Sequence, residues 1–206
     1  MRKKSHLSLA KFIMNNMHVE DLNEHKKAFY IGSILPDLKP SFLTKRHTID
    51  KTFDVLTDEI RKITVDYDIS RGMDGYYVRH LGVITHYLAD YCTFPHNSIF
   101  NGTMSEHVSY EKILMNSLKN YVESGAARRN RLHNTTGKTM EEILQLIKKI
   151  HKEYLGALKV VKRDIEYIVD LCYRVVDALI LFFETAYAKL HGGMKPDNLQ
   201  IGYSES

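Results

Sequence analysis

The sequence predicts an all-helical protein of one domain. Glycine and proline are sparse, at 11 and 4 residues, and the segments between them carry apolar residues at helical spacing with little strict alternation. The chain has 206 residues, 44% of them hydrophobic, which suffices to close a full core as a single domain. Because no repeat, low-complexity tract or linker divides the sequence, we expect one all-helical domain over residues 1–206.

Breaks in the apolar spacing divide the chain into the expected helices. Residues 35–40 contain two prolines, which lack amide donors and disfavour helix before them, so we expect an ordered loop there. Thr139, followed three residues later by Glu142, fits a capping box that opens the first of two long packing helices within residues 139–191. A frayed tail is expected over residues 192–206. The expected elements are a helix that ends near Asn15-Asn16, a charged connection through residues 24–27, a short helix that leads to Gly32, and helices over about residues 49–65, 76–91, 105–123, 139–155 and 159–190.

The helix expected over residues 76–91 is unusual because it is almost wholly apolar and yet carries a histidine and an aspartate. Apolar residues leave almost no polar face, so we expect this helix at the centre of the fold, packed on several sides. His86 and Asp90 lie within it. An unpartnered carboxylate in such a place is strongly destabilising, so Asp90 needs a strong hydrogen-bond donor or a metal ion.

Two histidine–acid pairs have a spacing of four residues: His86 with Asp90, and His107 with Glu111. Side chains at this spacing project from one helix face, and zinc takes histidine nitrogen and carboxylate oxygen as ligands. The spacing alone is not diagnostic, because the composition predicts about 1.3 such pairs by chance. Two alternatives therefore stay open: a hydrogen-bonded structural contact for the first pair, and a solvated helix face for the second.

The candidate ligands form a set whose order and spacing extend over the N-terminal half of the chain. The set consists of His6, the segment Gly32 to Asp37, His47, His86, Asp90, His96, His107 and Glu111. It resembles the zinc-dependent bacterial phospholipase C family over about residues 5–115, most specifically in Thr85-His86-Tyr87-Leu88-Ala89-Asp90 with Pro95-His96-Asn97. The resemblance implies an all-helical fold, a cluster of up to three zinc ions and cleavage of a phosphodiester.

Two zinc ions with largely separate ligands are implied by the resemblance. It also implies that Asp37 orients or deprotonates the attacking water, which makes Asp37 the candidate catalytic residue. Three carboxylates beside two or three divalent ions leave a net positive pocket, which attracts phosphate and favours a metal-bound hydroxide as the nucleophile. The implied ligands are Asp37, His47, His86 and Asp90 for the first ion, and His96, His107 and Glu111 for the second.

A third zinc ion is implied beside Asp90, which would bridge to it, with His6 as a further ligand. Secreted members of the family complete this third site with the amine and carbonyl of an N-terminal tryptophan. This chain contains no tryptophan. The expectation is therefore two zinc ions, with a third site that is weaker, completed by water or empty.

The expected function is hydrolysis of a phosphodiester of the phospholipase C type, with a phospholipid head group as the candidate substrate and a peripheral membrane contact as one expected partner. The formal charge of +4 is far from that of an electrostatic nucleic-acid binder, so no stable nucleic-acid complex is expected. A single-strand nuclease stays as an alternative, although related nucleases usually have Asp in place of Glu111. Arg128, Arg129 and Arg131 are candidate phosphate contacts or a merely solvated loop.

A non-catalytic helical protein stabilised by zinc is the second alternative. Structural zinc sites have four protein ligands, whereas catalytic sites keep an open position for water. The three ligands implied for the second ion favour an enzyme, unless His80 or Cys92 supplies a fourth.

Localisation is expected to be cytoplasmic. The N-terminal residues 5–11 include polar residues, a histidine and a lysine, where a signal peptide requires an apolar stretch. The most apolar run, residues 178–183, is far shorter than the roughly 20 residues of a membrane span. Two cysteines fit a reducing compartment in which thiols stay free.

Overall fold

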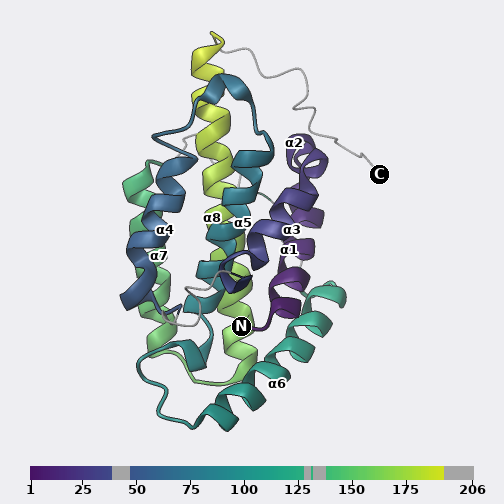
Figure 1. Cartoon of the computed structure of the whole chain (residues 1–206), viewed down its shortest axis with the longest axis vertical. Helices are drawn as coiled ribbons and strands as arrows, with labels where there is room; N and C mark the ends of the chain where they lie inside the picture. Colours follow the sequence, from purple (N-terminus) through teal and green to yellow (C-terminus); the bar gives the residue numbers. More distant parts are fainter. Residues whose placement is uncertain (39–46, 128–130, 132–137, 193–206) are drawn as a thin grey trace.

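The computed structural model describes residues 1–38, 47–127, 131 and 138–192. Over these residues the chain has eight α-helices, three 3₁₀ helices and no strand, which confirms the predicted all-helical fold class (Figure 1). The elements are α1 (Lys3–Met17), α2 (Glu20–Glu24), α3 (Lys26–Ile34), η1 (Pro36–Leu38), α4 (Ile49–Lys62), η3 (Ile69–Arg71), α5 (Gly75–Tyr91), η4 (Phe94–His96), α6 (Met104–Glu123), α7 (Met140–Gly156) and α8 (Val161–Leu190).

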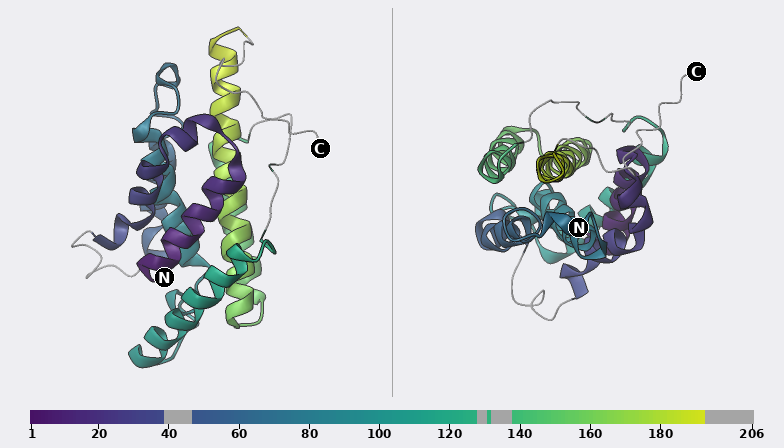
Figure 2. Two further views of the ribbon diagram at one scale, coloured as in Figure 1. Left: turned by 90° about the vertical axis from the view of Figure 1, so that its right-hand side faces the viewer. Right: turned by 90° about the horizontal axis from the view of Figure 1, so that it is seen from above.

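Helix α5 lies at the centre of the molecule, as its apolar sequence predicts (Figures 1 and 2). Of its 17 residues, 13 are buried, and it packs against α1, α3, α4 and α8. Its N-terminus is capped by the Asp74 carboxylate, which accepts a hydrogen bond from the Tyr77 amide. The helix therefore carries His86 and Asp90 into the interior of the molecule from a fixed starting point.

Two glycines allow α3 and α5 to approach backbone to backbone. A Cβ atom at Gly32 would lie 2.1 Å from the carbonyl oxygen of Arg79, and one at Gly82 would lie 2.3 Å from the carbonyl oxygen of Phe29. Neither position has room for a larger residue without movement of a helix. This close crossing places the end of α3, and with it η1 and Asp37, against the second half of α5.

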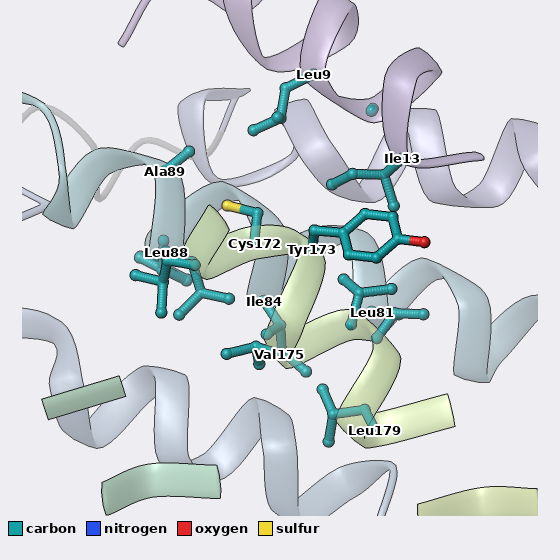
Figure 3. Packing of buried hydrophobic residues seen from close by; sticks show 14 of the residues in the cluster. Leu9, Ile13, Leu81, Ile84, Leu88, Ala89, Cys172, Tyr173, Val175 and Leu179 are labelled. Carbon is teal, nitrogen blue, oxygen red and sulfur yellow. The ribbon is translucent and has the colours of Figure 1, made fainter. Parts of the chain in front are cut away.

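Helices α1 and α8 close the remaining sides of α5. Figure 3 shows Ile84 of α5 beside Val175 of α8, with Leu9 and Ile13 of α1 above them. All four side chains are fully buried. Burying each such side chain contributes about 1.5–3 kcal/mol relative to leaving it exposed. The apolar core thus holds the helices that carry His6, His86 and Asp90 in a fixed relation.

The structure differs from the expected elements in two places. The charged connection expected over residues 24–27 is reduced to His25, because Glu20–Glu24 form the short helix α2 and Lys26 begins α3. Buried Leu22 attaches α2 to the core. Pro36–Leu38 form η1 where a loop was expected, because proline fits the first turn of a helix, where no amide donor is needed. The remainder of that loop, residues 39–46, lies outside the described residues, as does the expected tail beyond residue 192.

Candidate metal centre

The eight predicted ligands lie together at the C-terminal half of α5. They form three groups, and within each group the ligand atoms lie within 4.8 Å of one another. The ligands lie in α1, η1, α5, η4 and α6, and one of them, His47, lies two residues before α4. Residues far apart in sequence therefore converge on one place. The groups are His6 with Asp37 and His86, His47 with His86 and Asp90, and His96 with His107 and Glu111.

A hydrogen bond sets the orientation of the His86 ring. Its Nδ1 lies 2.9 Å from the carbonyl oxygen of Ser33, the residue before the end of α3. A carbonyl oxygen only accepts, so Nδ1 carries the proton and donates, and Nε2 is left with its lone pair. Nε2 lies 3.4 Å from Asp90 Oδ2 and 3.6 Å from Asp37 Oδ1. This arrangement, with the second ring nitrogen bonded to a carbonyl, is typical of histidines that bind metals.

His6 is buried without a hydrogen bond to either ring nitrogen. The residue is 1% exposed, and both Nδ1 and Nε2 lack a partner among the described residues. The ring stacks on that of His86, with centroids 3.9 Å apart, and its Nε2 lies 3.5 Å from Asp90 Oδ1. Burial, with a smaller contribution from nearby His86, lowers the pKa of His6 to about 3. The ring is therefore neutral, with a lone pair available to a ligand in the space that it shares with Asp90.

The carboxylates of the first two groups differ in their electrostatic surroundings. Burial opposes ionisation of Asp90, but His96, the Met1 amine and His86 outweigh it and hold the pKa of Asp90 well below its usual range. Burial raises the pKa of Asp37, only partly offset by His86. Asp90 is thus a buried anion, and its positive neighbour among the described residues is the Met1 amine, with which it forms an ion pair. A carboxylate buried in this way, beside three imidazole rings, has the chemistry of a metal ligand.

The third group is more open to solvent than the other two. The side chains of His96, His107 and Glu111 are 11%, 26% and 15% exposed, whereas His86 and Asp90 are at most 1% exposed. Glu111 Oε1 lies 3.1 Å from His96 Nε2 and 3.3 Å from His107 Nε2. Burial opposes ionisation of Glu111, but hydrogen bonds from His107 and His96 lower its pKa. Three ligands and a solvent-facing side describe a site with an open position.

Sequence reasoning did not consider one group that the structure places at this centre, the α-amine of Met1. This amine is buried, forms an ion pair with Asp90, and lies 3.1 Å from His96 Nε2 and 3.4 Å from Glu111 Oε1. It therefore stands between the buried groups and the open one. The prediction treated the absence of tryptophan as the loss of an amine donor beside His6. The available signal was the short spacing from Met1 to His6, because a helix that starts at Lys3 brings both to the same centre.

Other residues weighed from the sequence lie elsewhere. His80 pairs with Glu59 on α4, and buried Cys92 lies in the apolar core, so neither belongs to the group of His96. Arg131 faces α8, where it donates to Asp177 at 2.8 Å and to both carboxylate oxygens of Glu184 at 2.8 and 2.9 Å. It is engaged in these ion pairs instead of facing a phosphate. Arg128 and Arg129 lie outside the described residues.

A family model described as zinc dependent phospholipase C matches residues 5–159, well over half of the chain. The match includes all eight predicted ligands and extends beyond residues 5–115, over which the resemblance was expected, through α6 and α7 to the connection before α8. Comparison with curated proteins and with solved structures gives no match.

Proposed function

The chain belongs to the zinc-dependent phospholipase C family, and we propose that it uses this centre to hydrolyse the phosphodiester of a phospholipid head group. Membership in this family implies a phosphodiester hydrolase and a phospholipid substrate. The proposal assigns the eight side chains to zinc, with His86 and Asp90 at the buried side and His96, His107 and Glu111 at the open side.

The observation that carries the proposal is the buried ring of His6, neither nitrogen of which has a hydrogen bond to a described residue. A buried polar side chain without a hydrogen bond costs about 1–3 kcal/mol, and proteins rarely keep such a group without a reason. His6 Nε2 faces Asp90 Oδ1 at 3.5 Å, a separation at which one cation can contact both atoms. The proton on Nδ1 of His86 leaves Nε2 as the nitrogen that a metal would take, and Nε2 points toward His47 Nδ1, 3.0 Å away, within the second group. The donor set of imidazole nitrogen and carboxylate oxygen suits zinc.

The chemistry follows from which groups are buried and which are open. Zinc at such a centre polarises phosphoryl oxygens and lowers the pKa of a water molecule to near neutrality. We assign to Asp37 the orientation of the attacking water and acceptance of its proton, because its carboxylate lies beside His86 and His47 at 3.6 and 4.0 Å, next to both buried groups. The solvent-facing side of His107 and Glu111 is where a phosphate enters.

The test is Glu111→Gln, assayed with bis-p-nitrophenyl phosphate and with phosphatidylcholine. Glutamine keeps the size of the side chain but removes the anion, so zinc binds less well at the open group. We expect turnover to fall by about a hundredfold or more, because even residues that only orient metal ligands cost 10–100-fold. Helical content, measured by circular dichroism, should be unchanged.

The matched control is Glu123→Gln on the same helix, where the carboxylate is 62% exposed and should leave turnover unaffected. If the zinc site were purely structural, neither the wild type nor Glu111→Gln would hydrolyse the substrates, and the substitution would instead lower the melting temperature. Full turnover and full zinc content in Glu111→Gln would exclude this residue from the centre.

A further inference from the structure

The connection between α7 and α8 exposes apolar side chains that the core does not use. Leu155, Leu158 and Val160 are 36%, 72% and 48% exposed, within six consecutive positions. Tyr154 before them and Ile165 after them are buried, so the segment is attached to the core at both ends. Large apolar side chains gathered at one exposed turn mark an interaction surface more often than single exposed ones do.

The same stretch contains most of the excess positive charge of the protein. Residues 148–163, here named the basic turn, hold six bases and one acid, a net charge of +5. The other 190 residues hold 23 bases and 24 acids, a net charge of −1. Arg163 pairs with Glu166, and Lys159 donates to the carbonyl oxygens of Tyr154 and Leu155. Lys149, Lys152 and Lys162 are exposed and form no ion pair with a described residue.

Hydrogen bonds attach the basic turn to the elements that carry the open metal group. The Tyr154 hydroxyl donates to Asp164 Oδ1 at 2.9 Å. Asp164 Oδ2 accepts from the Phe94 amide at 2.8 Å and from the Tyr110 hydroxyl at 2.9 Å. Phe94 begins η4, which contains His96, and Tyr110 precedes Glu111 on α6. Figures 1 and 2 show the connection from α7 to α8 and the start of α6 at the same end of the molecule.

We propose that the basic turn docks the protein on an anionic lipid membrane. Leu155, Leu158 and Val160 would enter the boundary between head groups and acyl chains, while the lysines contact lipid phosphates above it. Apolar burial and basic charge are the two signals that stable peripheral binding requires together. Among the described residues, no helix is long and apolar enough to cross a bilayer.

Docking in this way would present the open metal group to lipid head groups. This consequence rests on the proposed function, whereas binding of the basic turn to the membrane does not depend on it. The charge complementarity favours a membrane rich in phosphatidylserine over one of phosphatidylcholine alone. Salt should weaken the binding, since the lysines act through a field that ions screen within about 10 Å at 0.1 M.

The experiment is co-sedimentation of the zinc-loaded full chain with vesicles of phosphatidylcholine containing 30% phosphatidylserine, beside vesicles of phosphatidylcholine alone. Leu158→Ser should weaken binding about tenfold, since it removes the most exposed apolar anchor. The triple variant Lys149→Gln, Lys152→Gln and Lys162→Gln should weaken it on the order of a hundredfold on the anionic vesicles. Both variants should keep their rate on the soluble ester bis-p-nitrophenyl phosphate and lose rate on vesicle lipid.

Two matched controls separate docking from general surface effects. Val65→Ser removes an apolar side chain that is 67% exposed, close to the 72% of Leu158, and should leave binding unchanged. Lys26→Gln, Lys27→Gln and Lys189→Gln together remove the same charge from exposed positions outside the basic turn and should weaken binding far less than the triple variant.

The proposal is overturned if the wild-type chain does not sediment with anionic vesicles. Binding of an acidic protein to the basic turn would not rescue it, because the proposal names a membrane as the partner. It is also overturned if the controls weaken binding as much as the variants in the basic turn. A chain that binds vesicles through Leu158 and the lysines but never cleaves the soluble ester or the vesicle lipid supports docking and contradicts the proposed hydrolysis.

Discussion

His86 is shared between two of the three groups of candidate ligands, and this sharing has a measurable consequence. Its Nε2 lies 3.4 Å from Asp90 and 3.6 Å from Asp37, while its ring stacks on His6. His107 belongs to one group alone and lies nearer to solvent. Equivalent substitutions at the two positions should therefore remove different amounts of metal.

We expect His86→Ala to lose more zinc per chain than His107→Ala, because the first variant weakens two groups and the second weakens one. Each weakened group should lose about a hundredfold or more in affinity. Elemental mass spectrometry after equilibration in the same zinc buffer measures the difference. His191→Ala, at the exposed end of α8, should keep the wild-type zinc content. Equal losses in His86→Ala and His107→Ala would contradict the sharing.

At the residue scale, the sequence identified side chains that the structure brings together, and their role as ligands stays a prediction. His86 and Asp90 could be found because a histidine and an acid in an apolar helix conflict with their surroundings. The Met1 amine could not be found by a search for residue types, since every chain has an α-amine; its short spacing to His6 was the signal in the sequence, and the fold places it beside Asp90. The proton position on His86 likewise depends on Ser33, 53 residues away.

At the scale of elements, Asp164 connects four segments of the chain. This fully buried residue of α8 accepts hydrogen bonds from Tyr154 on α7, Tyr110 on α6 and the Phe94 amide of η4. Burial raises the pKa of Asp164, and the three donors only partly compensate. Two of the connected segments, η4 and α6, carry the open metal group.

Asp164→Asn should lower the free energy of unfolding by about 1–3 kcal/mol, measured by urea denaturation. An asparagine is uncharged and has one acceptor oxygen, so its NH₂ group would take the place of one carboxylate oxygen, and the hydrogen bonds that this oxygen accepts would be lost or reversed. Asp170→Asn on the same helix is the matched control, because Asp170 is 41% exposed and should change stability by less than about 0.5 kcal/mol. Similar losses in both variants would show that Asp164 does not connect these segments.

Local signals predicted the elements better than the contacts between them. The capping box predicted from Thr139 and Glu142 is present at the start of α7, and a second one, Thr103 with Glu106, opens α6 one residue before the expected start. Both depend on residues three positions apart. The close crossing of α3 and α5 depends on Gly32 and Gly82, 50 residues apart, and no local pattern links these two positions.

On the scale of the whole molecule, the candidate centre is built from one side of the fold. Its ligands lie in α1, η1, α5, η4 and α6 and at His47, two residues before α4, whereas α7 and α8 contribute none among the described residues. Helix α1 packs on α6, and both helices carry candidate ligands: His6 on α1, and His107 and Glu111 on α6. Metal removal should therefore loosen the parts of the chain unequally.

Chelation of zinc should lower the melting temperature by about 5–10 °C, because zinc present at about 100 times its dissociation constant adds roughly 2.7 kcal/mol and each kcal/mol shifts a chain of this size by about 2–4 °C. Hydrogen exchange read by mass spectrometry should rise in α1, η4 and α6, where ligands are left as uncompensated buried charge or unpaired rings. The middle of α8 should keep its protection, because its buried residues, Val175 and Leu179 among them, pack in the core and belong to none of the three ligand groups. His6→Ala, measured beside the wild type, should show a smaller shift on chelation, since it has already lost one donor. Uniform loss of protection along the chain, or none, would contradict a centre that joins α1 to α6 through metal.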